Sequence, residues 1–495
     1  MKKRTIKIVI LSMLTLATVS SCEEELDQSS FSQIPLEQAM DGSSTANFTQ
    51  AINGAYSAIK GSGYFSTDTG NQIIVPDLTT DNLIYNPQGR SSNFTAYNWS
   101  FSANNGSVTG MFTQAYFVIS RANMPLLYLK NLPAGAFRNN IEGQARAIRA
   151  AAHFDLVRAY CKIPTQSSDA NASLGIPYIT EFNPLNNDVI RNNTVAQVYD
   201  NIIADLNFAV NNISDNPADK SKFSKAAVYG LLSRVYLYKG DYPNAIIAGN
   251  SSIALSASVG ARASFTNVWA SNNVDGVLFK VLNSTQENIT VGVAYQQGAT
   301  ATAGNIRSEY VVPKSLNDLY TATDIRKTAY IRTSAYVSGA TNVTRNNVVK
   351  WAFNTGGGSP LNVVEVKYLR TAEVYLNVAE AAYRQGGNET LANTLLNDLK
   401  AQRYSGYTPV TLSGTALLNE IMLQRRLELA FENDRFYTLK RLGLPMQRTG
   451  EGPNIDGTGT PSVVQTILPT DTRWQWPIPQ STINVTPAFQ QNPGY

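Results

Sequence analysis

The chain has 495 residues, of which 40 are lysine or arginine and 36 are aspartate or glutamate. Four of the cations lie within the first 21 residues, so the remainder of the chain carries no formal net charge. This balance excludes the electrostatic attraction on which nucleic-acid and polyanion binding depend. A chain of this length can bury a large hydrophobic core, and two cysteines are too few for a disulfide framework.

The N-terminus has the features of a bacterial lipoprotein signal. Residues 2–7 include four cations, residues 8–17 are mainly apolar, and Val-Ser-Ser at 19–21 precedes Cys22. The apolar run is too short to span a bilayer, and this order of segments is typical of a cleaved secretory signal. We predict a lipoprotein signal peptide over 1–21 and fatty acylation of Cys22, which anchors the protein to the outer membrane. The alternative is an ordinary signal peptide with an incidental cysteine.

An acidic segment follows the predicted anchor. Residues 23–27 contain four carboxylates, which repel one another and resist packing. We therefore predict a flexible tether over 22–33, which acts either as an export tag for surface lipoproteins or as a simple linker. Cys161 is then the only cysteine besides the anchor, which excludes an intramolecular disulfide.

Apolar residues recur with the 3.6-residue period of an α-helix in several segments. The predicted helices span 48–60, 106–130, 140–160, 195–213, 225–238 and 242–255. The last two, joined by a turn that contains glycine, have the pattern of a tetratricopeptide unit, and residues 368–403 repeat it. Stacked pairs of this kind cover one another's apolar faces and form a right-handed superhelical scaffold.

Between the helical segments the composition changes. Residues 61–105 and 256–364 are rich in Ser, Thr, Asn and Gly, with short strand-like runs such as 276–282. Loops of this kind on a rigid scaffold commonly carry binding groups. From Trp474 onward, four prolines predict an extended tail that is not helical.

We therefore predict a mainly α fold, in which tetratricopeptide-like helical pairs carry loop-rich irregular insertions and a few short strands. The expected division is an N-terminal helical region with binding loops over 34–255, and a C-terminal region with tetratricopeptide-like helices and the extended tail over 256–495.

The sequence lacks the usual catalytic and metal-binding patterns. The single histidine, His153, lies inside a predicted helix, and Cys161 is eight residues further on, too far along a helix to meet it. Zinc ligands of the usual kind are lacking. The glycines at 356–358 are not followed by the Lys-Ser/Thr of a phosphate-binding loop. We expect His153 to be a structural residue. We also expect that the protein holds neither a cofactor nor a metal.

Paired carboxylates are the remaining catalytic possibility. Glu428 and Glu432 are neighbours on a predicted helix and could mimic a glycosidase pair. Arginines at 425, 426 and 435 are interleaved with them, and such neighbours favour the ionised carboxylate, whereas a general acid must hold a proton. We expect a structural ion-pair network here, and a protein that is not an enzyme.

Aromatic and amide side chains cluster in the loops. A sugar offers an apolar C–H face and a rim of hydroxyls, so its site needs a flat ring beneath the face and hydrogen-bonding side chains around it. The loop over 80–100 supplies both. The candidate ligand-binding residues are Trp99, Tyr97, Asn98, Asp81, Tyr85, Arg90, Tyr64, Tyr295 and Trp351. The alternative is that Trp99 fills the junction between this loop and the core.

Four segments together resemble the SusD/RagB-like surface lipoproteins of the Bacteroidetes. They are GQARAIRAAAHFDLVRAY at 143–160, the helix at 368–383, RRLELAFENDRFYTLKRLG at 425–443, and the tail from PIPQ at 477 to QNPGY at 495. The resemblance spans nearly the whole chain after the signal and implies a tetratricopeptide-like helical fold. In the starch-binding member the contacts lie partly in the region corresponding to 64–99, which supports Trp99 by position. His153 stands where the family most often has tyrosine.

The resemblance also implies a partner. Such proteins form a lid over a SusC-like TonB-dependent transporter and deliver oligosaccharides, or in some members peptides, to it. The sequence thus predicts a glycan-binding lipoprotein, exposed at the cell outer membrane, with an oligosaccharide ligand and a SusC-like partner. A peptide-binding lid of the same fold and a surface glycosidase are the alternatives.

Overall fold

The computed structural model describes residues 34–66, 72–87, 89–186, 188–256, 258–270, 273–284, 291–296, 308–338, 341–351 and 365–495. The predicted signal peptide, the acylated Cys22, the tether over 22–33 and the glycines at 356–358 lie outside the described residues. None of the helices in the described ranges combines the length and the apolar character that a membrane span requires.

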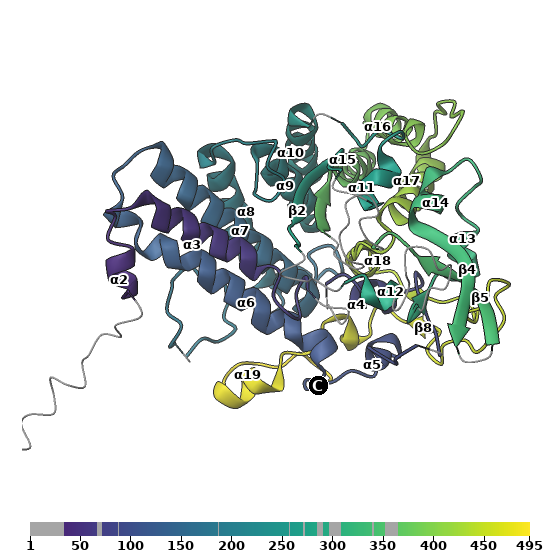
Figure 1. The fold of residues 1–495 in the computed structure, drawn as a ribbon, viewed down its shortest axis with the longest axis horizontal. Helices are drawn as coiled ribbons and strands as arrows, with labels where there is room; N and C mark the ends of the chain where they lie inside the picture. Colours follow the sequence, from purple (N-terminus) through teal and green to yellow (C-terminus); the bar gives the residue numbers. More distant parts are fainter. Residues whose placement is uncertain are drawn as a thin grey trace, which may run out of the picture.

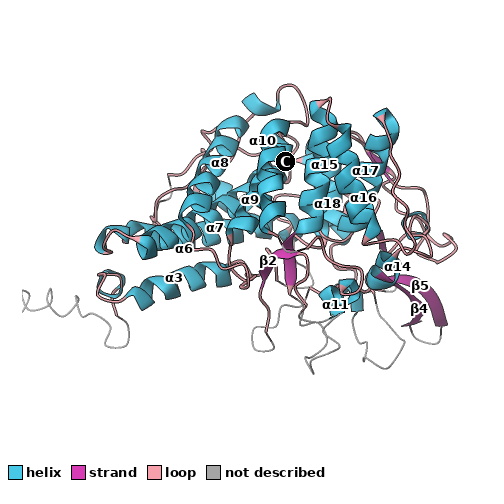
Figure 2. Ribbon diagram, turned by 90° about the horizontal axis from the view of Figure 1, so that it is seen from above, coloured by secondary structure: helices cyan, strands magenta, loops and turns pink. Residues whose placement is uncertain are grey.

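The long helices pack side by side in a row that crosses the molecule (Figures 1 and 2). Each packs on the one before it, and the last two both pack on α15. This arrangement confirms the predicted fold of mainly α-helical, stacked pairs. In the order of the row the helices are α3 (Thr45–Ala58), α6 (Gly106–Leu127), α7 (Ala136–Tyr160), α8 (Val195–Asn212), α9 (Lys225–Lys239), α10 (Tyr242–Leu255), α15 (Thr371–Gln385), α16 (Glu389–Ala401) and α17 (Gly414–Leu429).

The turn between α9 and α10 shows why the sequence forms a helical pair here. Ser224 caps α9, because its side chain accepts a hydrogen bond from the backbone N–H of Ala227. Gly240 ends the helix in the left-handed conformation (φ 81°), which glycine adopts without a steric penalty. Asp241 then caps α10 by accepting from the N–H of Asn244. The sequence therefore supplies locally the residues that begin both helices and the glycine that ends the first.

After α10 the row continues with α15, which lies more than 100 residues later in the chain. A glycine allows α10 and α15 to approach each other closely. A β-carbon on Gly249 of α10 would lie 2.1 Å from Cγ2 of Val378 on α15 and 3.1 Å from Oγ of Ser233 on α9. The two predicted regions, 34–255 and 256–495, contribute to one continuous hydrophobic core across this contact.

The strands of the described residues form three small sheets. The first has the strand order β1-β3-β5-β4, the second pairs β2 with β6, and the third pairs β7 with β8. The first places the loop at residues 84–85 beside residues 310–311, far away in sequence. The strands are β1 (Ile84–Tyr85), β2 (Val277–Val281), β3 (Tyr310–Val311), β4 (Ile331–Ser338), β5 (Thr341–Val348), β6 (Val366–Arg370), and the pair β7 (Met446–Gln447) and β8 (Thr466–Ile467).

Short helices fill the loops. They are α2 (Leu36–Ala39), α4 (Val75–Leu78), α5 (Phe94–Tyr97), α11 (Phe265–Ala270), α12 (Val293–Gln296), α13 (Lys314–Asn317), α14 (Ile325–Tyr330), α18 (Asp434–Arg441) and α19 (Gln480–Val485), with 3-10 turns η1 (Leu129–Asn131), η2 (Ala170–Ala172) and η3 (Thr472–Trp474).

The expectation that the tail from Trp474 onward is not helical is wrong, because part of the tail forms the helix α19. Pro479 precedes the helix at its N-cap and Pro487 follows it, so the residues between them keep every backbone N–H that a helix needs.

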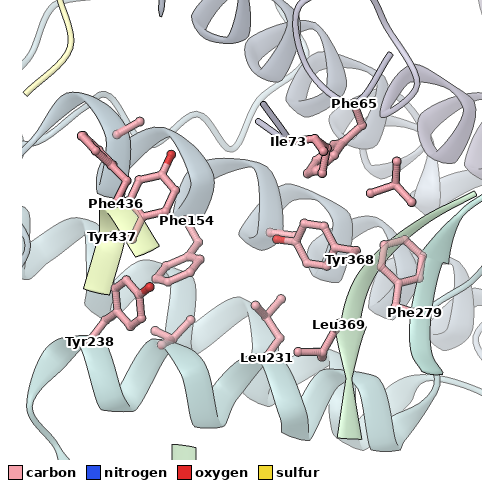
Figure 3. Close-up of a cluster of buried hydrophobic side chains, with 14 of the residues drawn as sticks. Phe65, Ile73, Phe154, Leu231, Tyr238, Phe279, Tyr368, Leu369, Phe436 and Tyr437 are labelled. Carbon is pink, nitrogen blue, oxygen red and sulfur yellow. The ribbon is translucent and has the colours of Figure 1, made fainter. Parts of the chain in front are cut away.

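Aromatic residues from distant segments meet in the core (Figure 3). Phe154 of α7 contacts Tyr238 of α9, with 5.4 Å between ring centroids. Tyr368 of β6 contacts both Phe65 and Phe279, at 5.6 and 5.5 Å. The row of helices, the loop before α4 and the β2–β6 pair are therefore one packed unit.

The close approach at Gly249 gives a test of this packing. We expect Gly249→Ala to lower the free energy of unfolding by about 1–3 kcal/mol, because the added methyl group forces the stiff Val378 side chain to move. The matched control is Gly54→Ala in α3, where a β-carbon meets nothing within 4 Å and alanine favours the helix by up to ~1 kcal/mol. Urea unfolding of both variants measures the difference. Equal stability of the two variants would show that α10 and α15 are not in close contact.

Candidate functional site

The two carboxylates predicted to share a helix both belong to an ion-pair network, but they do not share the helix. Glu428 is buried on α17, whereas Glu432 is partly buried and lies beyond the end of that helix at Leu429, which corrects the expectation. Glu428 contacts Arg403 at 2.9 Å, Arg370 at 2.8 Å and Arg326 at 3.3 Å. Burial alone would raise the pKa of Glu428, but the three arginines hold it well below its usual value. Glu432 is bound by Arg370 and Lys350. A carboxyl so strongly held in its ionised form cannot supply the proton of a general acid, and the predicted ion-pair network is confirmed.

The arginines of that network differ from the ones that the sequence suggested. Arg425 binds Asp434, whereas Arg426 and Arg435 extend to Asp81 in the N-terminal loop. Both oxygens of Asp81 accept hydrogen bonds from Arg435, each at 2.8 Å. Burial raises the pKa of Asp81, but the two arginines outweigh it and leave the pKa below its ordinary value. Asp81 therefore anchors the loop to α17 and α18, and its role as a ligand-binding group stays a prediction.

Most of the predicted aromatic platform lies in the core. The rings with at most 3% of their residue surface exposed are Trp99, Tyr97, Tyr64, Tyr295 and Trp351. A sugar stacks only on a ring face that solvent can reach. In this structure these five residues offer no such face, and the expectation that they form an open platform is corrected.

Trp99 illustrates the reason. Its indole N–H donates to the carbonyl of Thr79 at 2.8 Å, and its ring packs on Phe436 and Trp474, with centroids 6.0 and 5.1 Å away. A buried tryptophan with its N–H satisfied stabilises the fold strongly. Trp99 thus fills the junction between loop and core, the alternative that its sequence context left open.

The loop before Trp99 has an unusual backbone. Ser91, Asn93 and Trp99 adopt positive φ angles of 64°, 57° and 53°. For a bulky residue such as tryptophan this conformation costs about 1–3 kcal/mol, and it persists only where the surroundings fix it. The burial of Trp99 fixes the end of the segment 91–99. Strained segments of this kind concentrate at binding sites.

One aromatic pair on this loop does reach the surface. Phe94, at the start of α5, is 48% exposed, and Tyr85 of β1 is partly exposed beside it. Their rings meet edge to face with centroids 5.0 Å apart. The Tyr85 hydroxyl donates to Oγ of Ser91 at 2.6 Å. The ring of Tyr85 also packs on the buried ring of Tyr97, with the two ring centroids 5.9 Å apart. We call Tyr85 and Phe94 the ring pair.

Phe94 was missed at the sequence level. It differs from the buried rings near it only in facing outward from the first turn of α5, between Asn93 and Thr95. Neither the residue type nor its neighbours signal that orientation.

Polar side chains border the ring pair. Thr95 is exposed and Asn98 partly exposed, and both belong to the same turn of chain as Phe94. Arg90 is exposed too, and its Nε donates to Oε1 of Glu309 at 2.7 Å, which ties the loop to β3. An outward-facing ring pair beside hydroxyl, amide and guanidinium groups matches the apolar face and hydroxyl rim of a sugar.

A small cavity lies beside Ile84 and Tyr97, next to the loop that carries the ring pair. It has a volume of about 60 Å³, and its lining also includes Arg426 and Arg448. Arg448 stacks over the Tyr97 ring at 4.1 Å and donates to the carbonyls of Thr80 and Leu78. Burial lowers the pKa of Arg448 to about 10. Such a volume accommodates ordered water rather than a sugar, so ligand contact at this site is confined to its surface.

His153 is a structural residue, as its position predicted. Its Nδ1 lies 2.9 Å from the carbonyl of Arg149, its Nε2 accepts from the N–H of Ile179 at 3.0 Å, and its ring stacks on Tyr178. Burial lowers the pKa of His153 to about 3. The neutral ring suits both contacts, because one nitrogen must donate and the other must accept.

The burial of His153 makes the free energy of unfolding depend on pH. As the pH falls from 6.5 toward 3, the unfolded chain takes up a proton on His153 that the folded protein does not, so the free energy of unfolding falls. We expect a contribution of up to about 1.4 kcal/mol per pH unit from this residue. His153→Gln keeps an acceptor near Ile179 but does not titrate, so its stability should fall less steeply between pH 6 and pH 4 than that of the wild type. Parallel denaturation curves in which both proteins change alike would contradict this assignment.

Within the described part of the chain, no group of three or more His, Cys, Asp or Glu side chains is placed where it could hold a metal ion. Cys161 is buried, which raises the pKa of its thiol, and its sulfur lies 3.6 Å from Nη2 of Arg191. A thiol in this setting is held in its unreactive form.

Two protein-family models match the sequence. Residues 348–495 match the SusD family, and residues 16–237 match a family described as starch-binding and associating with the outer membrane. SusD-like protein P2 of Formosa agariphila is 27% identical over 92% of this chain and 95% of its own length. A SusD-like protein of Bacteroides ovatus is 23% identical over 67% of this chain and 65% of its own.

Solved structures share the fold. A putative sugar binding protein from Bacteroides vulgatus superimposes with a TM-score of 0.76 at 26% identity, covering 91% of this chain and 98% of that one. Surface glycan-binding protein A from Bacteroides uniformis gives a TM-score of 0.70 at 20% identity, covering 91% and 99%. A SusD superfamily protein from Bacteroides thetaiotaomicron gives 0.77 at 24%, covering 91% and 100%.

Proposed function

Because the chain belongs to the SusD family, we propose that it is a cell-surface lipoprotein that captures oligosaccharides and delivers them to a SusC-like TonB-dependent transporter. Support comes from the structural relatives described as sugar-binding or surface glycan-binding. The protein acts by holding its ligand and leaves the covalent bonds of the ligand unchanged. Glu428 and Glu432, the carboxylates that could have suggested hydrolysis, are both ion-paired, and Glu428 is buried.

The observation that carries this proposal is the ring pair. Tyr85 and Phe94 extend to the surface from a loop that buried contacts hold in place. Contact between an aromatic ring and an apolar face contributes about 0.5–1.5 kcal/mol beyond the area that it buries. A preformed surface loses little conformational freedom on binding, so most of that energy appears as affinity.

The arrangement of the chain suits a tethered protein. The described chain begins at α2, at one end of the molecule, whereas β4 and β5 lie at the other end (Figure 1). An acylated Cys22 joined to residue 34 through an acidic tether would attach the protein to the membrane at its α2 end. β1, which carries Tyr85, belongs to the same sheet as β4 and β5 and so lies toward the other end.

A peptide ligand is the second candidate. β4 is at the edge of its sheet, and a sheet edge can bind an extended peptide by adding a strand. Screening the purified protein against both oligosaccharides and oligopeptides separates the two proposals. Binding of peptides alone would exclude glycan capture.

Removal of the ring pair tests the proposed site. We expect Tyr85→Ala and Phe94→Ala each to weaken binding of an oligosaccharide found in that screen by up to about tenfold, because each removes one stacking face. Isothermal titration measures the affinities, and thermal unfolding checks that the fold is intact. Phe137→Ala is the matched control, since Phe137 is also an exposed phenylalanine, 37% exposed, but lies on α7. Unchanged affinity in the folded double variant Tyr85→Ala/Phe94→Ala would exclude this surface.

A further inference from the structure

We propose that a second sugar-binding site lies between α6 and α19, in a pocket that shares no lining residue with the ring pair. This inference rests on the proposed glycan-binding function. The pocket has a volume of about 430 Å³ and is bounded by α6, by residues 177–186 with Val189, and by α19. In Figure 1, α19 lies beside α6, on the lower edge of the molecule. The volume lies in the range of about 300–1,000 Å³ that is usual for small-molecule sites.

Aromatic rings form the inner wall of the α6–α19 pocket. Phe112 and Tyr116, one turn apart on α6, meet edge to face with centroids 5.0 Å apart. Phe489, which follows α19, packs on Phe112 at 6.0 Å. Tyr178 lines the opposite wall and is partly exposed, as is Tyr116. Phe112 and Phe489, each 4% exposed, back this wall, and the partly exposed Tyr116 and Tyr178 provide the apolar surface against which the C–H face of a sugar packs.

The rim is polar and contains no cation. Ser120, Glu181, Asn183 and Thr482 contribute hydroxyl, carboxylate and amide groups, and no lysine or arginine lines the pocket among the described residues. An anionic ligand would meet no opposite charge there, and a wholly apolar ligand would desolvate these polar groups without replacing their hydrogen bonds. A neutral ligand with many hydroxyls satisfies both conditions.

The outer wall is fixed from within the helical row. In the segment 177–181, the N–H of Ile179 donates to His153, and the amide of Asn123 donates to the carbonyls of Ile179 and Glu181, at 3.0 and 3.2 Å. The hydroxyl of Tyr116 donates to the carbonyl of Pro177. Because buried side chains already occupy these backbone groups, the segment is a poor edge for strand addition by a peptide. Its rigidity lowers the entropic cost of binding a sugar.

A larger cavity shows that volume alone does not indicate such a site. It measures about 650 Å³ and lies beside Cys161, between residues 161–191 and the C-terminal tail. Its lining, within the described residues, includes Lys162, Arg191 and several glutamines but no aromatic ring. The α6–α19 pocket differs in combining rings with a hydrogen-bonding rim that, among the described residues, has no lysine or arginine.

Blocking the pocket tests the inference. Ser120→Trp places a bulky side chain in the pocket from α6, and Asn183→Ala removes an exposed rim amide without disturbing the core. Ala254→Trp, at an exposed position of α10, controls for the added tryptophan. The probes are neutral oligomers of glucose, xylose, mannose and galactose, titrated calorimetrically into the full-length protein. We expect two binding events in the wild type. Ser120→Trp should weaken one at least tenfold and Asn183→Ala should weaken it less, while Ala254→Trp should leave both unchanged.

The outcomes separate this inference from the proposed function. Loss of all binding in Tyr85→Ala/Phe94→Ala, with unchanged binding in folded Ser120→Trp and Asn183→Ala, would overturn the second site and leave glycan binding intact. Binding that survives in Tyr85→Ala/Phe94→Ala and is lost in Ser120→Trp supports the pocket. If no sugar of the panel binds the wild type, the glycan-binding function is overturned, and the second site with it.

Discussion

The contact between Asp81 and two arginines of the C-terminal helices holds the candidate site together. Arg426 of α17 and Arg435 of α18 both bind this carboxylate, so the loop that follows α4 is attached to helices more than 340 residues away. Asp77 adds a second link, because it accepts from the backbone N–H of Asn433 at 2.9 Å. The ion pairs of Asp81 are partly buried, with 12% of the Asp81 side chain and 18% and 20% of the Arg426 and Arg435 side chains exposed. The position of the ring pair depends on this junction, together with the buried Trp99.

The packed frame of the fold and the proposed binding surfaces are different parts of the molecule. The row of helices and its buried ion pairs provide a packed frame. The surfaces proposed for recognition are attached to this frame: the ring pair, and the pocket between α6 and α19. In both places hydrogen bonds from buried side chains hold the backbone, so a ligand meets a surface that is already formed. This is the arrangement expected of a protein that captures a ligand and releases it unchanged.

The sequence predicts the helices well because their signals are local. The period of apolar residues, the cap at Ser224 and the glycine at 240 lie within or beside the helices that they define. The site is harder to predict, because tryptophan and tyrosine in a loop serve equally to anchor the loop and to bind a ligand. Trp99 does the first and Phe94 is positioned for the second, and only the tertiary structure separates them. The arginines that bind Glu428 likewise come from elements far apart in the sequence. The period of apolar residues does not indicate that these elements lie together.

The structure of the protein with a bound oligosaccharide tests the central claim most directly. The account predicts that an intact sugar packs its C–H face on Tyr85 and Phe94, with Trp99 still buried and hydrogen-bonded to Thr79. A sugar stacked on an indole that has turned outward from the core, or one whose glycosidic bond has been cleaved, would contradict it.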